Sequence, residues 1–90
     1  MYTVYAIRSL ITGRIYVGQT GDFEGRLREH NAGSVRSTKK DTPWEPFARK
    51  RFASRKEAMY VEWKIKRSKG LRERWLEAHK PEVSILRIGS

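Results

Sequence analysis

The pattern of apolar and polar residues at the start of the chain predicts two β-strands. Residues 2–8 read YTVYAIR and residues 14–19 read RIYVGQ, and both segments are rich in β-branched and aromatic side chains. Residues 9–13 between them have the composition of a turn. Such close spacing predicts an antiparallel hairpin with a loop of about five residues.

The next segment has the signals of a helix. Asp22 is placed to cap a helix that ends near Asn31, and Gly33 is placed to close it. Residues 33–46 show no helical or strand periodicity and carry Ser, Thr, Lys and Pro. We therefore expect a loop after the first helix.

The second half of the chain predicts a strand and two helices. Residues 47–52 favour a third strand, although their basic content weakens the pattern. Ser54 and Glu57 form an S-x-x-E capping box before an apolar helical stripe. Gly70 is interpreted as a stop signal, and residues 71–79 as a further helical stretch. The expected fold is an α/β (α+β) sheet with helices packed on it, in the order β-β-α-β-α-α.

The length of the chain limits the fold to one small domain over residues 1–90. A chain of 90 residues buries only about 60–65% of the surface that it exposes when unfolded. The hydrophobic content of 38% is nevertheless sufficient for a globular core. We find no internal repeat and no linker.

Charge is the most informative part of the composition. The formal net charge is +10, and the pI is near 10.4. Eleven basic residues face only three acidic ones between Arg49 and Arg74. This excess favours a polyanionic partner, because each Lys or Arg placed against a phosphate releases condensed counterions. A membrane surface also attracts such charge, and ribosomal and packaging proteins share this composition.

Several classes of protein and site are excluded by missing motifs. The chain has no cysteine, hence neither disulfides nor thiolate metal ligands. It has no run of about 18 apolar residues, and it begins with a strand pattern rather than a leader, so we expect a cytoplasmic protein without a membrane association. No G-x-S-x-G, P-loop or H-E-x-x-H motif is present, and two histidines cannot form a zinc site of several His and Cys ligands.

Polar residues occupy positions that belong to the inward faces of the predicted helices. Arg26 and His30, one turn apart, follow the same helical spacing as Phe23 and Leu27. On the next helix, Glu62 falls inside the apolar stripe of Ala58, Val61 and Ile65. A carboxylate beside a core is costly unless it is paired or binds a metal.

Each of these observations has a purely structural alternative. Glu62 can be a salt-bridge partner of Arg26 or of a nearby Lys. Arg26 can lay its aliphatic stem over an aromatic ring, and His30 can be a favourable contact at a helix C-terminus. Tyr5 and Tyr16 can be ordinary strand residues, and the basic runs a solvated face.

Together these residue types suit phosphodiester hydrolysis. The reaction needs a base for water, a cation that faces the developing negative charge, and a group that stabilises the leaving oxygen. A Tyr, an Arg and a Mg²⁺ bound to Glu can supply those three roles.

At these residues the sequence resembles the GIY-YIG nuclease family. Its first signature is present as Thr3-Val4-Tyr5 and its second as Tyr16-Val17-Gly18. Residues 22–31 match the helix that carries the family's Arg and, four residues later, its His. Glu62 matches the family's metal-binding Glu. The resemblance covers residues 2–78 and is strongest to small stand-alone bacterial members that consist of the catalytic module alone; relatives serve in homing, restriction and excinuclease (DNA repair) enzymes.

The resemblance implies a three-stranded antiparallel sheet and a set of catalytic roles. Tyr16 or Tyr5 would activate the attacking water, with His30 as a candidate proton acceptor. Arg26 would stabilise charge on the scissile phosphate. Glu62 would hold one Mg²⁺ or Mn²⁺ that assists the leaving 3′ oxygen, so that the products carry 5′-phosphate and 3′-hydroxyl ends.

The resemblance also implies that Gly18 would let the backbone pass close to the site.

The sequence departs from the family pattern at two positions. Position 19 is Gln where some relatives have Lys, and the family's Asn beyond the metal Glu is missing, since the only Asn is Asn31. The candidate substrate-binding residues are Gln19, Arg36, Lys39, Lys40, Lys64 and Lys69.

The sequence thus gives two functional hypotheses. The first is a metal-dependent endonuclease acting on DNA, with RNA left open and no obligate protein partner evident. The alternative is a non-catalytic nucleic-acid-binding module whose functional surface is the basic stretch 49–74.

Overall fold

The computed structural model of the chain describes residues 1–80. Three strands and three α-helices follow one another in the expected order β-β-α-β-α-α, which confirms the predicted fold class. The elements are β1 (Tyr2–Ser9), β2 (Ile15–Thr20), α1 (Phe23–Asn31), the short 3₁₀ helix η1 (Lys39–Asp41), β3 (Trp44–Phe52), α2 (Arg55–Arg67) and α3 (Lys69–His79).

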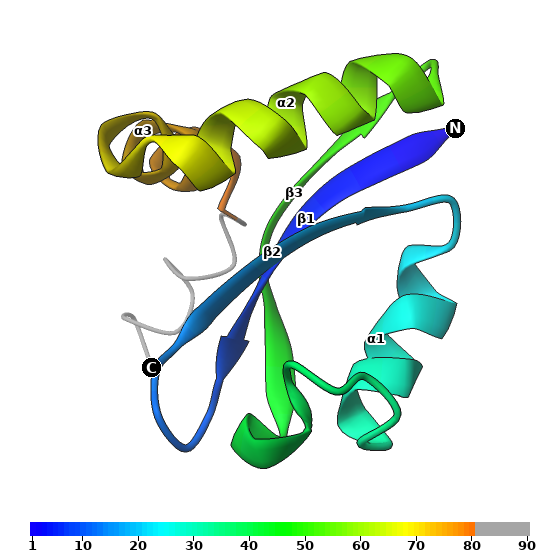
Figure 1. Cartoon of the computed structure of the whole chain (residues 1–90), viewed down its shortest axis with the longest axis vertical. Coiled ribbons are helices and arrows are strands. Elements are labelled where there is room, and N and C mark those ends of the chain that lie inside the picture. Colours follow the sequence, from blue (N-terminus) through cyan, green and yellow to red (C-terminus); the bar gives the residue numbers. More distant parts are fainter. Residues whose placement is uncertain (81–90) are drawn as a thin grey trace, which may run out of the picture.

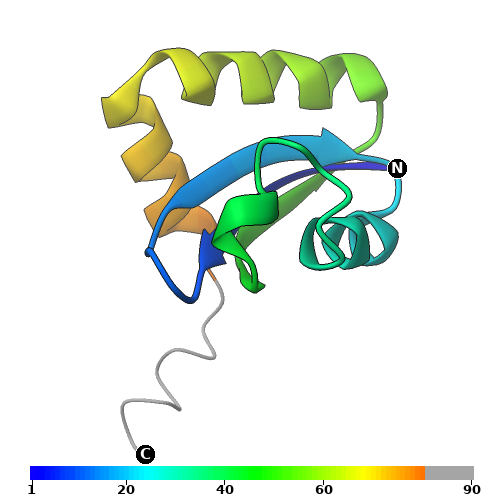
Figure 2. The same ribbon diagram turned by 60° about the horizontal axis from the view of Figure 1, so that its bottom comes forward.

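The sheet is antiparallel with the strand order β2-β1-β3, so β1 is central and the other two strands form the edges. Tyr5 of β1 lies opposite Gly18 of β2 and Arg49 of β3. Helices α2 and α3 cover one face of the sheet, and α1 with the segment around η1 covers the other (Figures 1 and 2). Because β1 is covered on both faces, residues 3–7 are all buried.

The two faces carry different cores. The face under α2 and α3 is aliphatic and contains Val4, Ala6, Val17, Ala48, Ala58 and Ile65. The face under α1 is mostly aromatic and contains Tyr5, Ile7, Phe23 and Trp44. Alternate residues of β1 point to opposite faces, which is why neighbours in sequence belong to different cores.

Strand β3 is longer than the sequence predicted, because it begins at Trp44 instead of Phe47. Pro46 had suggested a loop, yet a proline is tolerated on an edge strand, and the pairing register shifts beside it. The Asn31 side chain accepts a hydrogen bond from the Trp44 backbone N–H at 2.6 Å and donates one to its carbonyl at 3.1 Å. The end of α1 thereby holds the start of β3.

The predicted helix starts are confirmed. The Asp22 carboxylate accepts a hydrogen bond from the Gly25 backbone N–H, and the Ser54 hydroxyl accepts one from the Glu57 backbone N–H. Gly33 follows α1 with φ +76°, a left-handed conformation that favours glycine.

The predicted stop at Gly70 is wrong. Helix α2 ends at Arg67, and Ser68 serves both as its C-cap and as the N-cap of α3. The Ser68 hydroxyl accepts a hydrogen bond from the Leu71 backbone N–H, so Gly70 lies in the first turn of α3. A serine that can satisfy a free N–H begins a new helix more effectively than a glycine ends the old one.

Candidate active site

A continuous chain of polar side chains runs through the aromatic core. The Tyr5 hydroxyl lies 2.9 Å from His30 Nε2, and His30 Nδ1 lies 2.8 Å from the Thr38 hydroxyl. Tyr5 is 1% exposed, and His30 and Thr38 are both fully buried. His30 is therefore a buried core histidine with two partners and not the exposed dipole contact considered from sequence.

The direction of these hydrogen bonds follows from the Thr38 hydroxyl. We assign its single proton to the Val35 carbonyl, which lies 3.4 Å away. Thr38 is then an acceptor for the His30 Nδ1–H, which leaves Nε2 unprotonated. Nε2 in turn accepts the proton of the Tyr5 hydroxyl, so the chain donates from Tyr5 through His30 to the loop.

Burial sets the protonation of this chain. Burial raises the pKa of the Tyr5 hydroxyl to about 12, although the Arg26 guanidinium beside it acts in the opposite direction. Burial also lowers the pKa of the His30 imidazole, and the positive charge of Arg26 lowers it further. Near neutral pH both groups are uncharged, with Tyr5 as a donor and His30 as an acceptor.

Strand β2 places a second tyrosine, Tyr16, beside the Tyr5–His30–Thr38 chain, and its Gly18 leaves space for the Tyr5 ring. The Tyr16 ring lies 6.4 Å from the Tyr5 ring and 5.1 Å from the His30 ring, measured between centroids. A Cβ at position 18 would lie only 2.6 Å from the Tyr5 hydroxyl. The Tyr5 phenol can occupy its place only because Gly18 has no side chain.

Arg26 lies on α1 beside the buried chain and is half-buried. Its guanidinium donates to the Glu29 carboxylate at 2.9 Å and lies close enough to Tyr5 to influence its pKa. The side chain thus presents a positive charge at the edge of the aromatic core, held in place by a neighbouring carboxylate one turn away.

Glu62 reaches the same region from α2, on the opposite face of the sheet. Its negative charge is one of the causes that raise the pKa of the buried Tyr5 hydroxyl, after burial itself. The Glu62 side chain is 20% exposed and pairs with Lys66 at 2.9 Å, as the salt-bridge alternative anticipated, although Arg26 is not the partner. Residues from both faces can meet here because β2 is an edge strand.

Glu62 fits a single Mg²⁺ or Mn²⁺ of the kind that takes most of its ligands from elsewhere. Within residues 1–80 no group of three or more His, Asp or Glu side chains could enclose a metal. Mg²⁺ commonly keeps several waters and is bound by one or two carboxylates together with substrate phosphates. One half-buried carboxylate, whose partner Lys66 lines an adjoining groove, meets that requirement.

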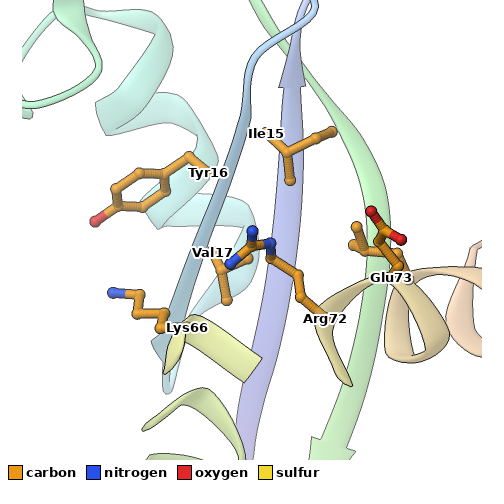
Figure 3. A pocket seen from close by; sticks show the side chains of 7 residues that line it. Ile15, Tyr16, Val17, Lys66, Arg72 and Glu73 are labelled. Atoms are coloured by element: carbon orange, nitrogen blue, oxygen red, sulfur yellow. The ribbon is translucent and has the colours of Figure 1, made fainter. Parts of the chain in front are cut away.

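This groove lies along β2 and has a volume of about 560 Å³. Lys66 from α2 and Arg72 from α3 extend toward β2, and Tyr16 projects beside them (Figure 3). The Lys66 ammonium lies 5.6 Å from the centre of the Tyr16 ring, and Arg72 donates to the Ile65 carbonyl at 3.3 Å. Glu73 is the acidic residue of the lining, so cations predominate beside Tyr16.

The candidate substrate-binding residues are dispersed over the surface. Arg36, Lys39 and Lys40 are exposed on the loop between α1 and β3, and Lys69 is exposed at the start of α3. Lys64 lies over the Tyr60 ring at 5.3 Å. Gln19 lies on the α2 face of β2, and its side-chain oxygen is buried without a hydrogen-bond partner in the described part of the chain.

Sequence reasoning missed three residues of this region. Thr38, which orients His30, stands in a Ser- and Thr-rich loop where nothing in the sequence distinguishes it. Lys66 and Arg72 were visible only as members of a basic stretch. For Lys66 the spacing from Glu62 was an available signal, since a Lys four residues after a Glu on a helix pairs with it. Arg72 lies on the next helix and had no such signal.

Comparison with known proteins identifies the family. Residues 1–79 match the family model described as the GIY-YIG catalytic domain. The chain therefore belongs to the GIY-YIG family, a nuclease superfamily.

Two relatives of similar size are known by family designation. The chain is 36% identical over 55 residues to a UPF0213 protein of Bacillus pumilus (strain SAFR-032), a match that covers 60% of this chain and about half (56%) of that relative's length. It is also similar to the solution NMR structure of a UPF0213 protein from Bacillus halodurans, with a TM-score of 0.57 and 27% identity over 91% of this chain and 89% of that one. Neither designation states an activity.

Within residues 1–80, no helix is long and apolar enough to cross a lipid bilayer.

Proposed function

We propose that this chain is a metal-dependent endonuclease that hydrolyses DNA phosphodiester bonds and leaves 5′-phosphate and 3′-hydroxyl ends. Residues 1–90 would form one GIY-YIG nuclease domain. The observation that carries the proposal is the buried Tyr5–His30–Thr38 chain, whose Tyr5 end lies beside Tyr16 and within the electrostatic influence of Arg26 and Glu62. Apolar side chains would fill a core equally well, so a fully satisfied polar chain at this place favours chemistry over packing.

Tyr16 is the better candidate to activate water. It is half-buried and lines the open groove, whereas the Tyr5 hydroxyl is buried and its proton is engaged by His30. Tyr5 and His30 are better suited to positioning: they fix the aromatic cluster against which Tyr16 packs, and His30 is held as a neutral acceptor that can take up a proton.

Arg26 and Glu62 supply the charges that the reaction requires. The Arg26 guanidinium would stand against the scissile phosphate and stabilise the negative charge that develops there. Glu62 would hold the metal, which supplies Lewis-acid stabilisation of the leaving oxygen when bound. Lys66 already neutralises Glu62 and would be released toward a phosphate once Glu62 has another partner.

The decisive experiment is cleavage of labelled single-stranded, duplex and branched DNA with Mg²⁺ or Mn²⁺, comparing wild type with Glu62→Gln. We expect cutting to require the metal and to fall by roughly 10²–10³-fold in Glu62→Gln, as when one transition-state stabilising group is removed. Glu77→Gln is the matched control, because Glu77 is an exposed carboxylate on α3 with its own Lys partner. Full metal-dependent cutting by Glu62→Gln would refute the metal role.

The second candidate is a non-catalytic nucleic-acid-binding module. One observation favours it: the Glu62 carboxylate is already paired with Lys66 at 2.9 Å. Tight binding without cutting on every substrate, with metal present, would support this candidate and contradict the nuclease.

A further inference from the structure

Helix α2 carries large aromatic residues on the side that faces away from the sheet. Tyr60 is 59% exposed and Trp63 is 55% exposed, and Met59 beside them is 48% exposed. Trp44, by contrast, is 3% exposed in the aromatic core. The outer face of α2 is thus an apolar surface that the fold does not bury, and such surfaces commonly mark binding sites.

The two rings are arranged as a platform with positive charge on it. The Tyr60 and Trp63 rings are stacked with an interplanar angle of 18° and centroids 6.4 Å apart. The Lys64 ammonium lies over the Tyr60 ring at 5.3 Å, and the Arg67 guanidinium lies over the Trp63 ring at 4.8 Å. Each ring is therefore paired with a cation from the next turn of the same helix.

We propose that this platform, made of Tyr60, Trp63, Lys64 and Arg67, binds unpaired bases of a single-stranded nucleic acid segment. Aromatic side chains interleaved with Lys and Arg are the recurrent means of holding single strands, since bases stack on the rings while phosphates meet the cations. Bases inside a duplex are already stacked, so the platform would prefer single-stranded segments.

A membrane or a protein partner fits these observations less well. An anionic lipid surface supplies negative charge for Lys64 and Arg67 but no planar groups that stack on the Tyr60 and Trp63 rings. A protein partner of the same surface would have to be strongly acidic to match a chain of net charge +10. A nucleic acid supplies both the stacking faces and the negative charge.

The platform is continuous with the candidate active site. Trp63 follows Glu62 directly, so its side chain lies about 100° around the helix from the carboxylate. Lys66, which pairs with Glu62, lies between them around the helix axis. A single strand laid across α2 would thus lead from the platform to the groove beside Tyr16. The inference shares with the proposed function only the assumption that the ligand is a nucleic acid.

The test measures binding without cleavage. Fluorescence anisotropy in EDTA would compare a short oligo-dT strand, an abasic strand of equal length and a duplex. We expect Trp63→Ala and Tyr60→Ala each to weaken oligo-dT binding by roughly 5- to 100-fold, and Trp63→Phe to retain most of the affinity, because one stacked base is lost or kept. Binding of the abasic strand should be unchanged. Leu10→Ala, which removes an apolar side chain of similar exposure in the β1–β2 turn, is the control.

Equal oligo-dT affinities for Trp63→Ala and Leu10→Ala would overturn the proposal. An equal loss of affinity for the abasic strand would also overturn it, since the effect would then be due to charge. Binding to anionic vesicles that depends on Trp63, without binding to oligo-dT, would overturn it as well. The nuclease proposal and the platform proposal fail in different experiments. Binding that depends on Trp63, without cutting in Mg²⁺, would refute only the nuclease. Cutting, with no effect of Trp63 on binding, would refute only the platform.

Discussion

The two faces of the sheet bury the same central strand with chemically different side chains. On the α2 and α3 face, Val4 and Ala6 meet aliphatic residues such as Ala58 and Ile65. On the α1 face, Tyr5 and Ile7 meet aromatic rings and two buried polar side chains. One face contributes stability with few polar atoms to satisfy, and the other uses core volume to hold hydroxyl and imidazole groups in fixed positions.

The energetics of the two faces should differ accordingly. Buried aliphatic side chains contribute through transfer from water and close packing, and their truncation leaves a cavity. A hydrogen bond inside a buried chain adds only about 1 kcal/mol, yet its removal leaves a desolvated partner and costs about 1–3 kcal/mol.

Ile65→Ala should be the most destabilising change. Truncating this buried residue, which is 4% exposed, should lower the free energy of unfolding by about 2–5 kcal/mol. Urea denaturation would measure the loss. Cleavage per folded molecule should stay near that of wild type, because Ile65 is not a catalytic group and Glu62, three residues earlier on the same helix, is not part of the aliphatic core. If Ile65→Ala does not fold, Ile65→Val provides a milder version, and a loss of cleavage out of proportion to the folded fraction would contradict the division of labour.

Tyr5→Phe should separate packing from chemistry on the aromatic face. The ring remains, but His30 Nε2 loses its donor, so we expect a loss of about 1–3 kcal/mol in unfolding free energy. Cleavage should fall by roughly 10²-fold as the polar chain loses its order. Ile7→Val is the control on the same face: it should cost about 0.5–1.5 kcal/mol and leave cleavage intact. Equal cleavage by both variants would show that the hydrogen-bonded Tyr5–His30–Thr38 chain is structural only.

The two histidines allow a pH test, since one lies in each half of the molecule. Burial lowers the pKa of His30, and burial together with the charge of Lys50 lowers that of His79. A folded-state pKa below the unfolded value means that the unfolded chain binds more protons. The contribution of each neutral histidine to the free energy of unfolding is therefore fully present above the unfolded pKa of about 6.5. It is lost as the pH falls toward the folded pKa.

Thermal unfolding over an acidic pH series would measure this dependence. His30→Gln should remove most of the slope below about pH 6.5, because His30 is fully buried whereas His79 is only partly so. His79→Gln should keep most of this pH dependence. A slope in His30→Gln equal to that of wild type would contradict the account of a buried neutral imidazole.

Lys66→Met should have the smallest effect on stability and a diagnostic effect on metal binding. Breaking an exposed i,i+4 pair costs about 0.5 kcal/mol or less. Freed of its ammonium partner, the Glu62 carboxylate should bind Mn²⁺ several-fold more tightly, as measured by titration calorimetry. Lys64→Met makes the same change in net charge without touching Glu62, so equal Mn²⁺ affinities in the two variants would contradict the proposed metal role.

Local signals in the sequence were sufficient for most of the fold. The caps at Asp22 and Ser54 and the β-branched and aromatic residues of the first two strands each act over a few residues, so they survive in any tertiary context. The two errors arose where context competes with local preference. Pro46 is accommodated because β3 is an edge strand, and Ser68 satisfies a free N–H that Gly70 cannot.

The sequence by itself determined the order of the elements and the residue types that resemble the GIY-YIG signatures, because both follow from short-range spacing. Only the tertiary structure decided that Tyr5 is buried against Gly18 and His30 while Tyr16 lines a groove, and that Glu62 pairs with Lys66. It also placed Thr38 as the partner that orients His30. These contacts join residues distant in the chain or depend on which strand forms the edge of the sheet, and the linear pattern contains neither kind of information.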